Sequence, residues 1–185
     1  MPKAILSVLG QDRPGIIAAV SESLFAQGCN IENVSQTILQ TEFSGIFIVA
    51  LPAALTLIEL HTALQTRLAP LQQHIHVKPL SDSVSAYVAP APCEPFVITT
   101  RGPDRKGLVA RITGVIARHG VNVTNLQAVF KGGAVAEDNI MIYEVDVPAT
   151  TDHRSLENEL RAEAAALDLD ISFQHRNIFE ALNRI

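Results

Sequence analysis

Two short segments carry the residues best suited to binding a small molecule. Gly10–Gly15 reads GQDRPG, and Gly102–Gly107, 92 positions later, reads GPDRKG. Each segment follows an apolar run and precedes a helical pattern, so its last glycine lies at a helix N-terminus. Unpaired N–H groups and the helix dipole favour an anion there. Glycine has no Cβ atom, so a ligand can approach the backbone closely.

The aspartate of each segment adds the opposite preference. A carboxylate beside an anion site can accept an ammonium group. The pair Asp12 and Gly15, like the pair Asp104 and Gly107, therefore matches the two ends of a free α-amino acid. The sequence predicts an amino-acid site in each half of the chain.

Other polar residues near these segments leave two interpretations open. Asn30 and Asn122 begin the next strand and could bind a ligand through their amides, or satisfy turn backbone instead. Asp12 could serve only as a helix N-cap, a common role of aspartate. Arg13 and Arg105 are expected to be solvated or paired with a carboxylate. Common ancestry of the two copies also accounts for the repetition.

The remaining candidates give no reaction chemistry. His74 and His76 share a strand face but lack a third metal ligand. The glycines at 132 and 133 belong to neither a Walker pattern nor a G-x-G-x-x-G pattern, so no nucleotide cradle is expected. No nucleophile, base and orienting group occur together. We therefore expect a protein that is not an enzyme and has no metal or cofactor.

The first copy of the repeat predicts a β-α-β-β-α-β order of elements. Apolar periodicity and turn residues give strands at 4–9, 30–39, 46–51 and 74–80, and helices at 14–27 and from a capping box at 56–59 to Pro70. Gly28 is expected to end the first helix in a left-handed conformation, and 41–45 to form the hairpin turn. This order is the split βαβ of ferredoxin-like domains, an antiparallel four-stranded sheet with both helices on one face.

The second copy repeats this order, so the predicted class is α+β with two ferredoxin-like domains. Strands are expected at 96–100, 122–130, 139–147 and 170–175, and helices at 107–119 and 156–167. Four extra residues fall in its hairpin, within 131–138. The predicted organisation is a domain at 1–80, a linker at 81–95, a domain at 96–176 and a docking helix at 177–185.

Each helix is expected to bury one apolar stripe. The expected stripes are Ile16, Val20 and Leu24 with Ile17 alongside, then Leu60, Leu64 and Leu68, and then Leu108, Ile112 and Ile116.

Bulk properties exclude several classes of function. The net charge of −5 opposes contact with nucleic-acid phosphates or an anionic membrane. No signal-peptide pattern or apolar run of about 18 residues is present. The two cysteines, Cys29 and Cys93, fit a reducing cytoplasm. Domains of this size often gain stability by packing on a neighbour. We therefore expect a cytoplasmic protein whose two domains pack side by side with pseudo-twofold symmetry, and which forms a homo-oligomer such as a dimer.

Two motifs carry a resemblance to a known family. Residues 12–17 (DRPGII), followed by 28–31 (GCNI), resemble an ACT domain, a small-molecule regulatory module with the βαββαβ order. A chain of two such domains resembles the glycine cleavage system transcriptional repressor family. That resemblance implies a tandem ACT regulator that responds to glycine or a similar small amino acid. It also implies that the protein acts through a transcriptional activator protein, without touching DNA itself.

The resemblance also implies which residues bind the ligand. The predicted set is Asp12, Arg13, Gly15, Ile16 and Asn30 in the first copy, and Asp104, Gly107, Leu108 and Asn122 in the second. The second copy departs from the motif because Lys106 replaces the proline and Pro103 precedes the aspartate. Its site is expected to differ in ligand or to be silent.

Two alternative functions share this topology. A free-standing regulatory subunit of an amino-acid metabolic enzyme would use the same sensor. RRM domains have the same element order, and residues 45–49 (GIFIV) resemble part of their third strand. RNA recognition of that kind needs paired exposed aromatic residues and positive charge, which this acidic chain with nine aromatics does not favour.

Overall fold

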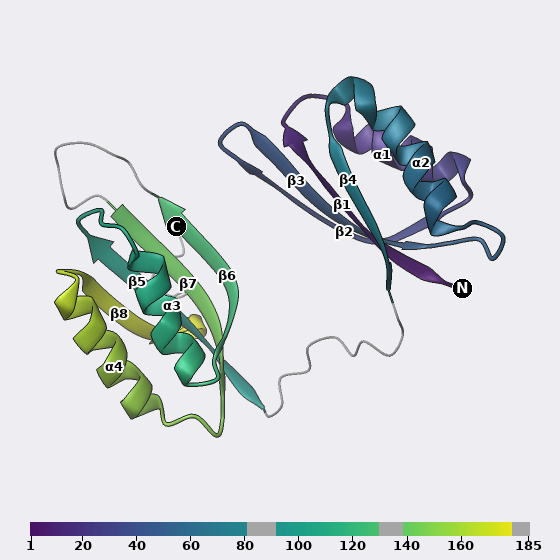
Figure 1. The fold of residues 1–185 in the computed structure, drawn as a ribbon. Coiled ribbons are helices and arrows are strands. Elements are labelled where there is room, and N and C mark those ends of the chain that lie inside the picture. Colours follow the sequence, from purple (N-terminus) through teal and green to yellow (C-terminus); the bar gives the residue numbers. More distant parts are fainter. Residues whose placement is uncertain (81–91, 130–138, 179–185) are drawn as a thin grey trace. The chain divides into compact units, whose positions relative to one another are not determined.

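The chain divides into two compact units, Met1–Ala86 and Tyr87–Ile185. The computed structural model describes residues 1–80, 92–129 and 139–178 (Figure 1). The extra hairpin residues at 131–138, most of the expected linker and most of the expected docking helix lie outside the described residues. No helix in these three ranges combines the length and apolar character needed to cross a membrane.

The first domain has the predicted β-α-β-β-α-β order. Its sheet has the strand order β2-β3-β1-β4, with every neighbouring pair antiparallel. The elements are β1 (Lys3–Gln11), α1 (Ile16–Ala26), β2 (Asn30–Leu39), β3 (Glu42–Ala50), α2 (Leu57–Leu68), the 3₁₀ turn η1 (Ala69–Leu71) and β4 (His74–Leu80).

The second domain repeats this architecture, which confirms the predicted fold class. Its sheet has the order β6-β7-β5-β8, again antiparallel throughout. The elements are β5 (Cys93–Gly102), α3 (Leu108–Arg118), β6 (Asn122–Val129), β7 (Asn139–Pro148), α4 (His153–Ala166) and β8 (Asp170–His175).

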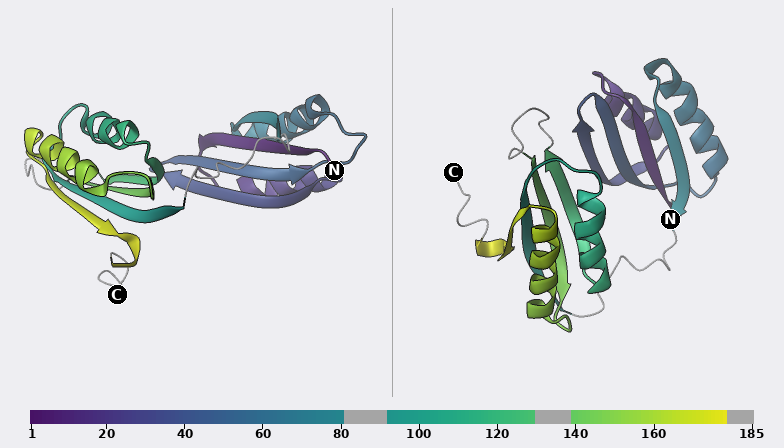
Figure 2. Two further views of the ribbon diagram at one scale, coloured as in Figure 1. Left: turned by 90° about the horizontal axis from the view of Figure 1, so that it is seen from below. Right: turned by 60° about the vertical axis from the view of Figure 1, so that its left-hand side comes forward.

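In each domain both helices cover one face of the sheet, as Figure 2 shows. The core lies between the sheet and the predicted helix stripes: Ile16, Val20, Leu24, Leu60, Leu64, Leu68, Leu108, Ile112 and Ile116 are each 2% exposed or less. Ile17 is the exception, because its side chain is 38% exposed. It lies one residue beyond the buried stripe, and one helical step of about 100° turns it from the sheet.

Local signals set the helix ends. Thr56 accepts a hydrogen bond from the Glu59 amide, and the Glu59 carboxylate accepts one from the Thr56 amide, which confirms the capping box at the start of α2. Gly28, which follows the C-cap residue Gln27 of α1, has φ of 70°, so the predicted left-handed conformation is confirmed. Asp152 caps α4 by accepting from the Arg154 and Ser155 amides, so this helix begins three residues before the predicted start at 156.

The first hairpin turn is tighter than predicted. β3 begins at Glu42, and Gln40, with φ of 56°, and Thr41 form a two-residue turn. The prediction of a turn at 41–45 was therefore wrong. Phe43 explains the difference, because it is 2% exposed and continues the buried alternation of β3. Polar residues around it had concealed this alternation in the sequence.

The first strand of the second domain begins earlier than predicted. β5 begins at Cys93, within the range expected for a linker, and contains Pro95. A proline fits there because β8 pairs with β5 only from Phe96 onward, so no second ladder needs its missing N–H. At the other end of the domain, residues 176–178 are helical, and Arg176 Nη2 lies 3.2 Å from Glu144 Oε2 on β7.

Candidate ligand-binding site

The loop between β1 and α1 carries the first predicted site. The Asp12 amide donates to the Thr41 carbonyl oxygen at 2.7 Å, which ties the loop to the β2–β3 turn. Helix α1 starts at Ile16, and the first helical hydrogen bond runs from the Ala19 amide to the Gly15 carbonyl. Amides before Ala19 have no acceptor within the helix, so they are available to an anion.

No side chain caps α1, so the alternative that Asp12 serves as a helix cap is wrong. Gly15 is the N-cap residue with φ of 97°. Beyond the adjoining residues of its own chain segment, a Cβ atom on Gly15 would meet nothing within 4 Å. The backbone at the start of α1 is therefore open to a small ligand, with the exposed carboxylate of Asp12 in the same loop.

The second domain has the same backbone arrangement. Gly107 is the N-cap of α3 with φ of 88°, no side chain caps the helix, and a Cβ atom there would also meet nothing within 4 Å. Asp104 is exposed. Ile16 and Leu108, the first residues of the two helices, are each 2% exposed and belong to the cores, so their side chains are not open to a ligand.

The two arginines brace the loops against the turn that precedes the last strand of each domain. Arg13 Nη2 donates to Gln72 Oε1 at 3.2 Å, whereas Arg105 forms an ion pair with Asp168. Gln72 and Asp168 hold the same place, with φ of 54° and 55°. The prediction that an arginine pairs with a carboxylate is confirmed for Arg105, while Arg13 binds neutral amides.

Asn30 lies at the opposite end of the sheet from Asp12. Asn30 pairs with Ala50, and Ala50 pairs with Lys3 at the start of β1, while Asp12 follows the end of β1. A strand of nine residues spans roughly 30 Å. The sequence already indicated this separation. In the predicted topology β1 and β2 are parallel, so Asn30 at the start of β2 lies at the opposite end of the sheet from Asp12, which follows β1.

Asn122 repeats this placement in the second domain. It pairs with Asp146, which pairs with Pro95 near the start of β5. Each domain thus brings together its aspartate, arginine and N-cap glycine, and separates its asparagine from them.

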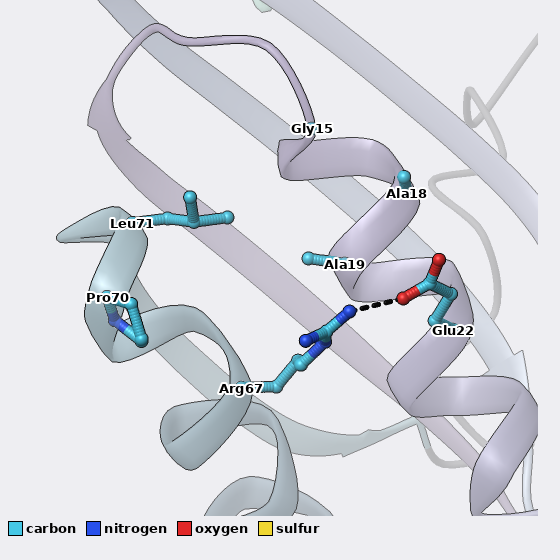
Figure 3. Close-up of a pocket in the computed structure, with 7 residues that line it drawn as sticks. All are labelled: Gly15, Ala18, Ala19, Glu22, Arg67, Pro70 and Leu71. Carbon is cyan, nitrogen blue, oxygen red and sulfur yellow. Dashed lines mark hydrogen bonds and ion pairs between the residues drawn. The ribbon is translucent and has the colours of Figure 1, made fainter.

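A hollow of about 320 Å³ lies beside Gly15, between α1 and the end of α2 (Figure 3). The other lining residues are Ala18, Ala19, Glu22, Arg67, Pro70 and Leu71. Glu22 and Arg67 form an ion pair across it, with side chains that are 63% and 56% exposed. Such exposed pairs are weak, so these groups can change partner. This hollow was not predicted, because only its small residues at 18 and 19 are adjacent in the sequence, whereas Arg67, Pro70 and Leu71 come from a distant segment.

The aromatic residues on strands do not form an RNA-binding face. Phe47, within the segment that resembles an RRM strand, is 1% exposed in the first core. Phe96 and Phe173 stack with ring centroids 4.6 Å apart, and both pack against the second core. Among the described strand residues, the aromatic side chains thus lie with the core.

Comparisons with known proteins agree with this architecture. The family model described as "ACT domain" matches residues 3–78 and 94–174. A UPF0237 protein from Methanosarcina acetivorans is 32% identical over 91 residues, which are 49% of this chain and 95% of the relative.

Two solved structures share the fold over both domains. The crystal structure of an unknown protein from Galdieria sulphuraria has a TM-score of 0.75 at 24% identity, over 94% of this chain and 98% of that one. The crystal structure of a candidate glycine cleavage system transcriptional repressor has a TM-score of 0.63 at 20% identity, over 94% and 96% of the two chains.

Proposed function

Because the chain belongs to the ACT-domain family and carries this domain twice, we propose that it is a regulatory protein that senses glycine or a similar small amino acid. The observation that carries the proposal is the open backbone at Gly15, where a Cβ atom would meet nothing within 4 Å. This backbone lies at a helix N-terminus without a side-chain cap.

The ligand has two charged ends, and the first domain offers a group for each. Its carboxylate accepts hydrogen bonds from the amides at the start of α1, where the helix dipole favours negative charge. Its ammonium group binds the Asp12 carboxylate, which is exposed and not used as a cap. A ligand of five heavy atoms gains at most about 1.5 kcal/mol per atom, so glycine binds with micromolar affinity at best.

A site that also uses Asn30 needs a second domain. Asn30 lies at the far end of its own sheet, so the amide that completes the site comes from a second copy of the chain. The proposal therefore includes a homo-oligomer, such as a symmetric dimer.

The output of the sensor is proposed to be transcription of glycine or one-carbon metabolism genes, through an activator protein as partner. The net charge of −5 opposes direct contact with DNA phosphates. The fold likeness to the candidate repressor supports a regulatory role of this kind. Ligand shifts such a protein between states only by its difference in affinity for the two states.

A thermal-shift screen of the full chain against the twenty amino acids tests the sensor. A ligand at 100 times its dissociation constant should add about 2.7 kcal/mol to the free energy of unfolding. The variant Asp12→Asn should then bind this ligand roughly tenfold to a hundredfold more weakly by calorimetry, because it loses a charge-assisted hydrogen bond. Asp170→Asn, at an exposed position on β8, is the control and should bind like the wild type. Unchanged affinity in Asp12→Asn would contradict the proposed binding mode.

A gel-shift experiment tests the output. The purified protein alone should not shift promoter DNA, whereas adding the activator should produce a complex that responds to the amino acid. Salt-sensitive, sequence-selective DNA binding by the protein alone contradicts the proposal. Recovery of an amino-acid metabolic enzyme as the ligand-dependent partner would instead identify a regulatory subunit.

A further inference from the structure

The positions that surround the open glycine differ between the two domains. Ala19 and Arg111 are structural equivalents, because their amides donate the first helical hydrogen bond to Gly15 and Gly107, each at 2.9 Å. In the first domain Ala19 lines the hollow beside Gly15. In the second domain the same position carries a long side chain, and Arg111 forms an ion pair with Glu163 of α4.

The second helices of the two domains, α2 and α4, carry opposite charges at equivalent positions. Arg67 precedes the buried Leu68, and Glu163 precedes the buried Ala164, which takes the same place in the stripe of α4. Arg67 pairs with Glu22, which lies further along α1 than Ala19. Ion pairs therefore link the two helices in both domains, but only in the second does one of them, Arg111–Glu163, start from the position next to the N-cap turn.

The loop arginines of the two domains also have different partners. Arg13 hydrogen-bonds to the amide oxygens of Gln11 and Gln72, so its positive charge has no carboxylate in these contacts. Arg105 pairs with Asp168. A ligand carboxylate near the first loop gains from the charge of Arg13, whereas near the second loop it meets the carboxylate of Asp168. Two neighbouring carboxylates repel each other, so Asp168 opposes binding of a ligand carboxylate at the second loop.

We propose that the chain carries one site for a small ligand with a free carboxylate, in the first domain. The second domain is closed to this ligand by the Arg105–Asp168 and Arg111–Glu163 ion pairs. The inference rests on the proposed function, and it makes the duplicated domains unequal: one binds the signal, and the other serves a different purpose in the chain.

Titration of the full chain with glycine, or with the amino acid that gives the largest thermal shift, tests the stoichiometry. Calorimetry should give one ligand per chain. In nitrogen-15 NMR spectra the amide signal of Gly15 should move during the titration, and that of Gly107 should stay in place. Two ligands per chain would overturn the inference while leaving the proposed function intact. Movement of the Gly107 signal alone would overturn both the inference and the proposed binding mode at Gly15.

Gln72→Asp tests the charge argument, because it copies the second domain into the first. Its affinity for the ligand should fall about tenfold. The matched control is Gln72→Asn, which has the same shape, tolerates the left-handed backbone equally and should stay within about twofold of the wild type. Equal affinities of these two variants would overturn the role of charge at this position.

Ala19→Arg tests the hollow, because it places a long side chain where the second domain has one. Binding should be lost, while Ala26→Arg, at the far end of the same helix, should bind normally. Normal binding by Ala19→Arg would overturn the role of the hollow. If none of the twenty amino acids binds the wild-type chain, the proposed function fails and this inference with it.

Discussion

The Gln73 side chain lies directly against the backbone of Gly10. A Cβ atom on Gly10 would be 2.8 Å from Gln73 Oε1, well inside van der Waals contact. Gln73 is 7% exposed, and its Nε2 donates to the carbonyl oxygens of Gln11 and Leu71, both at 2.9 Å. The first glycine of the hexapeptide is therefore needed for packing, whereas the last leaves its backbone open.

Gly10→Ala should lower the free energy of unfolding of the first domain. Its Cβ would also lie 2.8 Å from the Gln72 carbonyl oxygen, and overpacking of this kind costs about 1–3 kcal/mol. Urea denaturation followed by circular dichroism measures the change. Gly114→Ala, in α3, is the control: its Cβ would meet its nearest neighbour at 3.9 Å, so its stability should stay equal or rise by roughly 0.5–1 kcal/mol. Wild-type stability of Gly10→Ala would contradict the close packing.

Most of the fold could be predicted because the signals are local. The strand limits at Asn30–Leu39, His74–Leu80 and Asp170–His175 agree with the sequence analysis, since turn residues and alternation define them. The capping box at Thr56 fixed the start of α2 in the same way. Such features depend on residues within about four positions of one another.

The site could be predicted only in part because its remaining features are not local. The hollow beside Gly15 is lined by the small residues Ala18 and Ala19 on α1 and by Arg67 on α2, nearly fifty residues away in the sequence. The packing of Gly10 depends on Gln73 across the domain. Both features join residues that are far apart in the sequence, and no periodic pattern in the sequence indicates that they meet. The repeated motif indicated where a ligand could bind, and the surrounding side chains decide whether each copy is open.

Gly15→Ala should cost about 1–2 kcal/mol of stability, because residues with a Cβ are strained in the left-handed region. No steric clash adds to this cost, since the space around the Cβ position is open. Gly107→Ala, with φ of 88°, should cost a similar amount and is the matched control. Calorimetry then separates the two: only the change at Gly15 should weaken glycine binding. Equal binding by both variants would argue against the first-domain site.

Thr56→Ala should lower the stability of the first domain by about 1 kcal/mol, because it removes the acceptor for the Glu59 amide at the start of α2. Thermal unfolding measures the loss. Thr62→Ala is the control, because its hydroxyl donates only to the Ile58 carbonyl within the same helix, which adds little stability. Its unfolding temperature should be unchanged or slightly higher. A larger loss in Thr62→Ala than in Thr56→Ala would contradict the assignment of the cap.

Tyr143 should make the free energy of unfolding of the second domain fall at alkaline pH. Its side chain is fully buried, and its hydroxyl group lies 3.3 Å from the Met141 sulfur, a weak acceptor. Burial disfavours the phenolate and raises the pKa of Tyr143 to about 12 from its ordinary value of 10.0. In the unfolded chain the hydroxyl ionises at the lower, ordinary pKa. As the pH rises, ionisation therefore stabilises the unfolded state before it can occur in the folded state.

The stability of the wild type should therefore be complete below pH 10 and fall between pH 10 and about 12, by up to about 3 kcal/mol from this group. Tyr143→Phe removes the ionisable group and little else, because the thioether contact is weak. Its stability at pH 7 should lie within about 1 kcal/mol of the wild type. Above pH 10 the variant should unfold at a higher denaturant concentration than the wild type. If both proteins lost stability equally from pH 9 to 12, the pKa of Tyr143 would not differ between the folded and unfolded states, which would contradict the prediction.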